Sequence, residues 1–151
     1  MLEISDFMTE HHKFCDDLFI QGESAVEKEQ WDEASKKWYL FADELEKHFQ
    51  REETILFPEF ETLTGMTQGP TEMMRIEHQQ IREIVKEISK SCENKDKINY
   101  LGLAETLMVT MQQHNMKEEQ ILYPMIENTI LNKDEIINDM IAMSPLGTNS
   151  D

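Results

Sequence analysis

The sequence contains few of the residues that interrupt helices or cross-link chains. Among 151 residues there are 5 glycines, 4 prolines and 2 cysteines. Cys15 and Cys92 lie far apart, which excludes a disulfide-stapled secreted domain and favours a reducing, cytoplasmic location. The long stretches between the glycines and prolines are dominated by Leu, Ile, Met, Glu, Lys and Gln, a composition typical of helices.

Basic residues and long apolar runs are also lacking. The chain has 14 basic against 31 acidic residues and a formal net charge of −17, which disfavours nucleic acids and anionic membrane surfaces as partners. No apolar stretch approaches the roughly 18 to 20 residues that span a bilayer. The first 30 residues contain no basic segment followed by an apolar one, as a signal peptide would. We therefore expect no nucleic-acid or membrane partner.

Apolar residues recur at steps of three and four, the spacing of an α-helix. Four main helices are predicted at roughly 3–24, 30–61, 70–92 and 97–131, with a first break that begins at Gly22. Pro58 and Pro124 interrupt helical patterns, so each is expected to kink or close its helix. The connections favour an all-α fold, an antiparallel up-down-up-down four-helix bundle.

A weaker helical pattern follows the four main helices. The segment KDEIINDMIAM is expected to form a short fifth helix before a polar tail. We therefore predict a four-helix domain over residues 1–132, and a short C-terminal helix with a frayed tail over 133–151.

One phrase occurs twice in the chain. HFQREETILFP (48–58) and HNMKEEQILYP (114–124) share histidine, two glutamates, Ile-Leu, an aromatic residue and proline in matching places. The step in sequence from His48 to His114 equals the step from His12 to His78, and we call this common step the repeat offset. The first and second pairs of helices are therefore predicted to be two structural repeats.

Within these repeats, histidines and glutamates continue the apolar seams of the helices and are predicted to face inward. Burying such groups would cost several kcal/mol per unpaired ion unless a bound cation compensates them. The HxxxE spacing places each glutamate one helical turn from its histidine, so both can reach one metal. Four converging helices can hold two metals bridged by the glutamates, and mixed imidazole and carboxylate ligation suits Fe, Mn, Zn or Co. The predicted ligands are His12, His48, Glu52, His78, His114 and Glu118.

Neighbouring residues leave alternatives open. His11 is one position off the seam and is interpreted as a surface or boundary residue. Glu53 and Glu119 are rotated by about 140° from the histidines of their phrases, so they are expected outside the ligand set or exposed, although Glu119 stays an alternative to Glu118. Cys15 is either a small buried hydrophobe or a thiol near the metals. Three methionines are predicted to line the metal site as ordinary core side chains: Met8, Met74 and Met111.

These phrases, together with HHKFCDDLF and GMTQGPTEMMRIEHQQIR, give the chain a resemblance to the hemerythrin-like (HHE cation-binding) proteins up to about residue 131. The resemblance implies a non-heme di-iron centre held by the six predicted ligands, with Zn or Mn as substitute metals. Oxygen-carrying hemerythrins place a histidine where this chain has Met74. Their last carboxylate is an aspartate at the fifth position after its histidine, where this chain offers Glu118 and Glu119 at the fourth and fifth positions.

Three functions compete. The first is a binding protein for O2, or for NO, that serves oxygen binding, storage or sensing. The second is a di-iron oxidoreductase that reduces peroxide or NO, or a protein that donates iron for repair. The third is a helical interaction module with a structural metal, which would need coordinatively closed metals. No catalytic residue is assigned, and homodimerisation and an electron-donor partner are left open.

Overall fold

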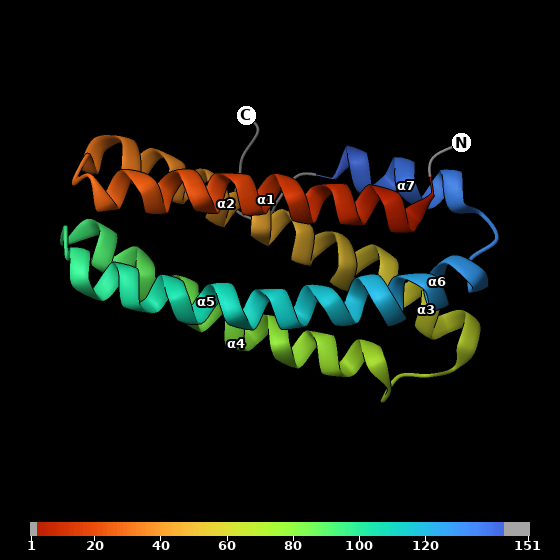
Figure 1. Ribbon diagram of the computed structural model, residues 1–151. Helices are drawn as coiled ribbons and strands as arrows, with labels where there is room; N and C mark the ends of the chain where they lie inside the picture. Colours follow the sequence, from red (N-terminus) through yellow and green to blue (C-terminus); the bar gives the residue numbers. More distant parts are fainter. Residues whose placement is uncertain (1–2, 144–151) are drawn as a thin grey trace.

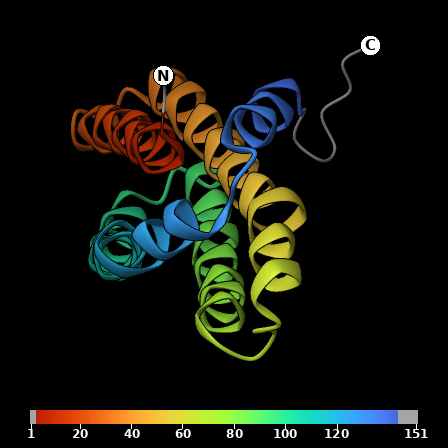
Figure 2. The ribbon, with the colours of Figure 1, turned by 90° about the vertical axis from the view of Figure 1, so that its right-hand side faces the viewer.

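The structure is a computed structural model that describes residues 3–143, and its regular elements in that range are all helical. Four long helices form an antiparallel bundle: α1 (Ile4–Glu27), α2 (Trp31–Arg51), α4 (Pro70–Glu93) and α5 (Lys97–Lys117). Figure 1 shows α1 running beside α2 and α4 beside α5, and Figure 2 shows the bundle viewed from its end. The predicted fold class is confirmed.

Two of the long helices continue through a wider, π-helical turn. After α2 come η1 (Glu52–Leu56) and α3 (Phe57–Thr64), and after α5 come η2 (Glu118–Leu122) and α6 (Tyr123–Thr129). Pro58 and Pro124 lie just after these turns, as the second residues of α3 and α6. Because proline lacks an N–H and crowds the carbonyl one turn earlier, a local change in winding accommodates it without ending the helix. The helices therefore run on to residues 64 and 129.

The connections within each repeat are equivalent turns. The α1–α2 and α4–α5 turns make the same four backbone hydrogen bonds, between residues related by the repeat offset. Glu29 and Lys95, which correspond in the repeats, have positive φ angles of 55° and 53°. The predicted break beginning at Gly22 is wrong, because α1 continues to Glu27. Gly22 instead permits close packing, since an added Cβ would lie 3.3 Å from the Tyr100 hydroxyl.

The expected short C-terminal helix is α7 (Lys133–Ala142). Its buried residues Ile136, Ile137 and Met140 join the apolar cluster at one end of the bundle. The Arg51 side chain Nε donates a 2.9 Å hydrogen bond to the Met140 carbonyl. The predicted frayed tail lies beyond residue 143, outside the described residues, and the domain boundary at 132 stays a prediction. Among residues 3–143, no helix is both long and apolar enough to cross a membrane.

The buried core consists of two apolar clusters. One surrounds Trp38 and Phe41, and the other surrounds Phe57 and Phe60 near α7. Full burial of each large apolar side chain stabilises the fold by about 1.5–3 kcal/mol. The three methionines expected to be buried are buried, Met8 and Met74 in the end cluster and Met111 in the other. Along each long helix and its continuation, the inward histidine lies between residues of the two clusters, as His12 does between Met8 and Cys15. The histidines therefore form a polar layer within the apolar core.

Candidate metal centre

All six predicted ligand residues meet in this polar layer. Their side chains come from the four long helices and the two π-helical turns, and the most exposed of them, His12, is 4% exposed. They form two groups, each with ligand atoms that lie within 4.8 Å of one another. We name them the first position (His12, His48 and both glutamates) and the second position (His78, His114 and both glutamates). Because Glu52 and Glu118 belong to both groups, the two positions are adjacent and share two carboxylates.

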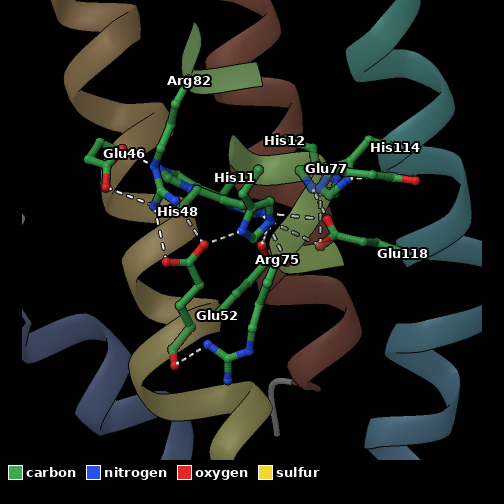
Figure 3. A network of polar contacts seen from close by, with 12 residues as sticks. His11, His12, Glu46, His48, Glu52, Arg75, Glu77, Arg82, His114 and Glu118 are labelled. Atoms are coloured by element: carbon green, nitrogen blue, oxygen red, sulfur yellow. Dashed lines mark hydrogen bonds and ion pairs between the residues drawn. The ribbon is translucent and has the colours of Figure 1, made fainter. Parts of the chain in front are cut away.

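The carboxylates are oriented to serve both positions. Glu118 presents Oε1 to His12 Nε2 at 3.0 Å and Oε2 to His114 Nε2 at 3.3 Å. Glu52 presents Oε2 to His48 Nε2 at 3.4 Å and Oε1 to His78 Nε2 at 3.0 Å. Each glutamate therefore has one oxygen on each side, the arrangement needed to bridge two cations. Figure 3 shows part of this cluster, with histidines and glutamates projecting between the helices.

The electrostatics of the layer favour cations. Burial alone would lower the pKa of His12, but hydrogen bonds with Glu118 and Glu119 outweigh it and raise that pKa to about 9. His78 is affected in the same way, and its pKa lies well above the usual value. Burial alone would raise the pKa of Glu118, yet the His114 charge and hydrogen bonds hold it well below its usual range. Positive charge therefore balances the buried carboxylates, and protons would compete with a metal for the same nitrogens.

A second set of side chains holds the other ring nitrogen, Nδ1, of each inward histidine. Such contacts fix the tautomer and orientation of a metal-ligating imidazole and raise its basicity. Three partners are carboxylates and one is an imidazole. The pairs are His12 with Glu119 at 2.6 Å, His78 with Glu53 at 2.6 Å, His114 with Glu77 at 2.8 Å, and His48 with His11 Nδ1 at 2.9 Å.

Further groups anchor these partners. Arg82 donates hydrogen bonds of 3.0 and 3.1 Å to Glu53 and two of 2.9 Å to Glu46. Figure 3 shows Arg82 beside Glu46. Lys117 Nζ donates to Glu77 at 2.5 Å. Burial alone would raise the pKa of Glu53, but the hydrogen bonds from His78 and Arg82 lower it. Glu53 therefore stays an ionised acceptor for its histidine.

The residues beside the predicted ligands lie around the polar layer but outside both metal-capable groups. Glu53 and Glu119 contact Nδ1 atoms, so Glu118 is the carboxylate that faces the Nε2 atoms. His11 is a boundary residue, with its side chain 10% exposed, but it also contacts His48. Cys15 lies in the apolar core, where burial raises the pKa of its thiol, and it joins neither metal-capable group of the described residues. The buried-hydrophobe interpretation of Cys15 is therefore favoured.

Tyr123 is a site residue that the sequence reasoning missed. Its hydroxyl lies 2.6 Å from Glu52 Oε2, 2.8 Å from Glu118 Oε1, 3.1 Å from His48 Nε2 and 3.3 Å from His12 Nε2. Burial and the two carboxylates raise the pKa of Tyr123 well above its usual value, so the phenol keeps its proton. The signal was present in the sequence, because the repeated phrase ends in LYP here and in LFP at Phe57.

Glu77 and Arg82 were also missed. Glu77 corresponds to His11 at the repeat offset, so a search for partners at repeat-equivalent positions would have found it. Nothing in the sequence pattern singles out Arg82, because its contacts with Glu46 and Glu53 join different helices.

The unpaired atoms of the layer test whether a metal fits. Within residues 3–143, four buried side-chain atoms of the second position make no hydrogen bond of suitable geometry, although they face one another in pairs: His78 Nε2 and Glu52 Oε1 at 3.0 Å, and His114 Nε2 and Glu118 Oε2 at 3.3 Å. A cation at that point would be coordinated by all four. The donor set, imidazole nitrogen with carboxylate oxygen, fits a divalent transition metal.

Comparison with known proteins agrees with the geometry. A family model described as the hemerythrin HHE cation binding domain matches residues 3–126. An uncharacterized hemerythrin-like protein of Schizosaccharomyces pombe is 26% identical over 137 residues, which make up 90% of this chain and 65% of that relative. The chain thus spans slightly less than two thirds of the relative's length, and no solved structure gives a significant match. Because the family model covers most of the chain, the protein belongs to the hemerythrin HHE cation-binding family.

Proposed function

We propose that this chain is a non-heme di-iron protein that binds a small neutral diatomic molecule, O2 or NO, for oxygen binding, storage or sensing. The observation that carries the proposal is the pair of adjacent positions that share Glu52 and Glu118. The proposed ligands of the two irons are His12, His48, Glu52, His78, His114 and Glu118.

The number of ligands supports an open site. Each position offers two imidazole nitrogens and two carboxylate oxygens. Non-heme iron sites that use two histidines and a carboxylate keep coordination positions free, whereas a structural site is coordinatively closed. Iron held in this way would supply a free coordination position for a diatomic ligand. The resemblance to hemerythrin-like proteins favours iron, and zinc or manganese would suit the same donors.

The surrounding residues support a small, uncharged ligand. All six proposed ligand residues are at most 4% exposed, and apolar clusters lie on both sides of their layer. Such surroundings limit water and charged molecules, because a charge would lose its hydration without a prepared partner. The groups on Nδ1 hold the imidazole rings in place, so the protein itself provides the orientation of the donors.

One observation favours an oxidoreductase as the second candidate. The phenol of Tyr123 lies within hydrogen-bonding distance of both shared carboxylates and keeps its proton. A hydrogen-bond donor at that place could hold peroxide or NO while it is reduced. A protein that donates iron for repair also stays a candidate, since it would use the same donors.

The experiment is metal analysis of anaerobically purified protein, followed by optical spectra on adding O2 or NO. We expect about two irons per chain, and a spectral change with O2 that reverses on degassing. Irreversible oxidation with turnover of peroxide or NO would favour the enzyme. No spectral response to either gas would overturn the proposal and favour a structural metal.

A matched pair of variants tests the site itself. Glu118→Gln should lose bound metal, because the amide is a poorer ligand and cannot carry the bridging charge. Glu61→Gln is the control, since Glu61 pairs with Arg75 and Thr71 outside the centre. Equal metal content in the two variants would contradict the assignment of Glu118.

A further inference from the structure

We propose that the two metal positions are unequal: the second position binds its ion more tightly, and the first is the exchangeable one, because His11 occupies the place where the other repeat has Glu77. The inference rests on the proposed two-metal site and adds an order of binding. It comes from four differences between repeats that are otherwise alike.

The first difference lies behind His48 and His114, which correspond at the repeat offset. His114 Nδ1 lies 2.8 Å from a carboxylate oxygen of Glu77. His48 Nδ1 lies 2.9 Å from Nδ1 of His11, the residue that corresponds to Glu77. A carboxylate bonded directly to an imidazole raises its basicity toward a metal, and a neutral imidazole does so less. His114 should therefore be the stronger ligand.

The second difference is that His48 depends on a chain of two groups. His11 Nε2 lies 2.9 Å from Glu44 Oε1, and an ionised carboxylate only accepts hydrogen bonds. Neutral His11 therefore donates from Nε2 and accepts at Nδ1. His48 must then donate from its own Nδ1, which leaves its Nε2 lone pair free for a metal. Glu44 and His11 are thus positioning residues that select the metal-binding tautomer of His48. The negative charge of Glu44 is separated from His48 by the His11 ring, whereas Glu77 bonds to His114 directly.

The third difference is how the backing carboxylates are held. In the second position, the side chains of Glu53 and Glu77 are 16% and 14% exposed, and they are bonded to Arg82 and Lys117 respectively. These cations neutralise part of the carboxylate charge, yet they also fix the orientation of the carboxylates. In the first position, the Glu119 side chain is 36% exposed, and its ion pair among the described residues is with His12. The first position is therefore supported by the looser contact.

The fourth difference is the residue that faces the metal-binding atoms. The Tyr123 hydroxyl lies within 3.3 Å of polar atoms of all four residues of the first position. A cation that binds there has to displace some of these hydrogen bonds. The second position has Phe57 at the corresponding place, and no hydroxyl bonds to its donor atoms. Protons are displaced from both positions, but the cost of displacing the Tyr123 hydroxyl falls on the first position.

The test begins with equilibrium titration of metal-free protein with Zn²⁺, in competition with a chelator of known affinity. We expect two binding steps that differ by about tenfold or more, the scale of effects from groups behind metal ligands. Co²⁺ gives an optical spectrum for each step. To assign the steps, His48→Ala should keep the tight step and His114→Ala should abolish it.

Reciprocal swaps then test the cause. His11→Glu should strengthen the weak step about tenfold, bringing the two affinities together. Arg51 corresponds to Lys117 in the repeats and could pair with the new carboxylate. Glu77→His should weaken the tight step by a similar factor. Glu44→Gln, whose amide no longer dictates the His11 tautomer, should weaken only the weak step, and this variant carries the test if His11→Glu does not fold.

The outcomes separate this inference from the function on which it rests. Fewer than two bound Zn²⁺ ions in the parent would contradict the two-metal site itself. Two ions of equal affinity, or a tight step that survives His114→Ala, would leave that site standing and overturn the proposed inequality. Unequal steps that stay the same in both swaps and in Glu44→Gln would overturn the role given to His11.

Discussion

Replacing Tyr123 by phenylalanine should destabilise the metal-free protein and tighten metal binding. The hydroxyl lies 2.6 Å from Glu52 and 2.8 Å from Glu118, and both carboxylates are fully buried. A hydrogen bond to a charged group contributes about 1.5–3 kcal/mol. A phenyl ring should fit, because Phe57 fills the corresponding place in the other repeat. We therefore expect the free energy of unfolding of the metal-free variant to fall by about 2 kcal/mol.

The metal-loaded protein should lose less, because a bound cation takes over the carboxylate oxygens. In a thermodynamic cycle, the variant gains metal affinity by the amount by which the metal-free protein loses more stability than the metal-loaded protein. If the loaded protein lost nothing, about 2 kcal/mol would correspond to an affinity about 30-fold higher. The gain should appear in the weaker of the two binding steps, since the hydroxyl contacts the first position.

The assay is urea unfolding of metal-free and Zn²⁺-saturated protein, combined with the chelator titration. Tyr39→Phe is the matched control, because the Tyr39 hydroxyl bonds to Glu93 at 3.1 Å in an exposed contact. Its effect should stay within about 0.5 kcal/mol. An unchanged stability of metal-free Tyr123→Phe would refute the hydrogen-bond argument. Weaker metal binding by Tyr123→Phe would show that the phenol oxygen helps to hold the metal and does not compete with it.

Three further predictions concern metal binding, pH and Met74. Zn²⁺ at a free concentration about 1,000 times its dissociation constant should stabilise the fold by about 4 kcal/mol. The melting temperature should then be higher than in chelator-treated protein. An unchanged melting temperature would contradict a buried metal site. In metal-free protein the pKa of His12 is raised from 6.5 to about 9. The contribution of His12 to the free energy of unfolding is therefore fully present below pH 6.5, and it is lost as the pH rises through 9. Urea unfolding should therefore show a loss of up to about 3 kcal/mol between pH 6.5 and 10, absent when Zn²⁺ is bound. Met74 is 3% exposed and lies one turn before His78. Met74→His should therefore add a nitrogen ligand and change the Co²⁺ spectrum, whereas Met74→Leu should not. Identical spectra of the two variants would show that position 74 does not reach the metal.

Much of the centre could be predicted from the sequence because it depends on periodicity along single helices. Inward-facing residues follow the apolar seam, and HxxxE places both donors on one face. The repeat offset relates His12 to His78 and aligns the two repeated phrases. It therefore predicted that the histidines of the two repeats occupy equivalent heights along the bundle. These regularities were sufficient to predict the fold class. They were also sufficient to predict that the six residues come together, as they do in the structure.

The contacts behind the histidines were decided by the tertiary structure. His12 meets Glu119 across 107 residues and His114 meets Glu77 across 37, so these pairs depend on how neighbouring helices are rotated and shifted against each other. The winding of the π-helical turns adds to this, because it directs Glu118 to the centre and its neighbour Glu119 to an Nδ1 atom. Periodicity within one helix specifies the face on which a side chain lies, but not the atom opposite it on another helix. The sequence by itself therefore determined which groups the protein buries, and only the packing of the helices decided which nitrogen of each histidine is left for a metal.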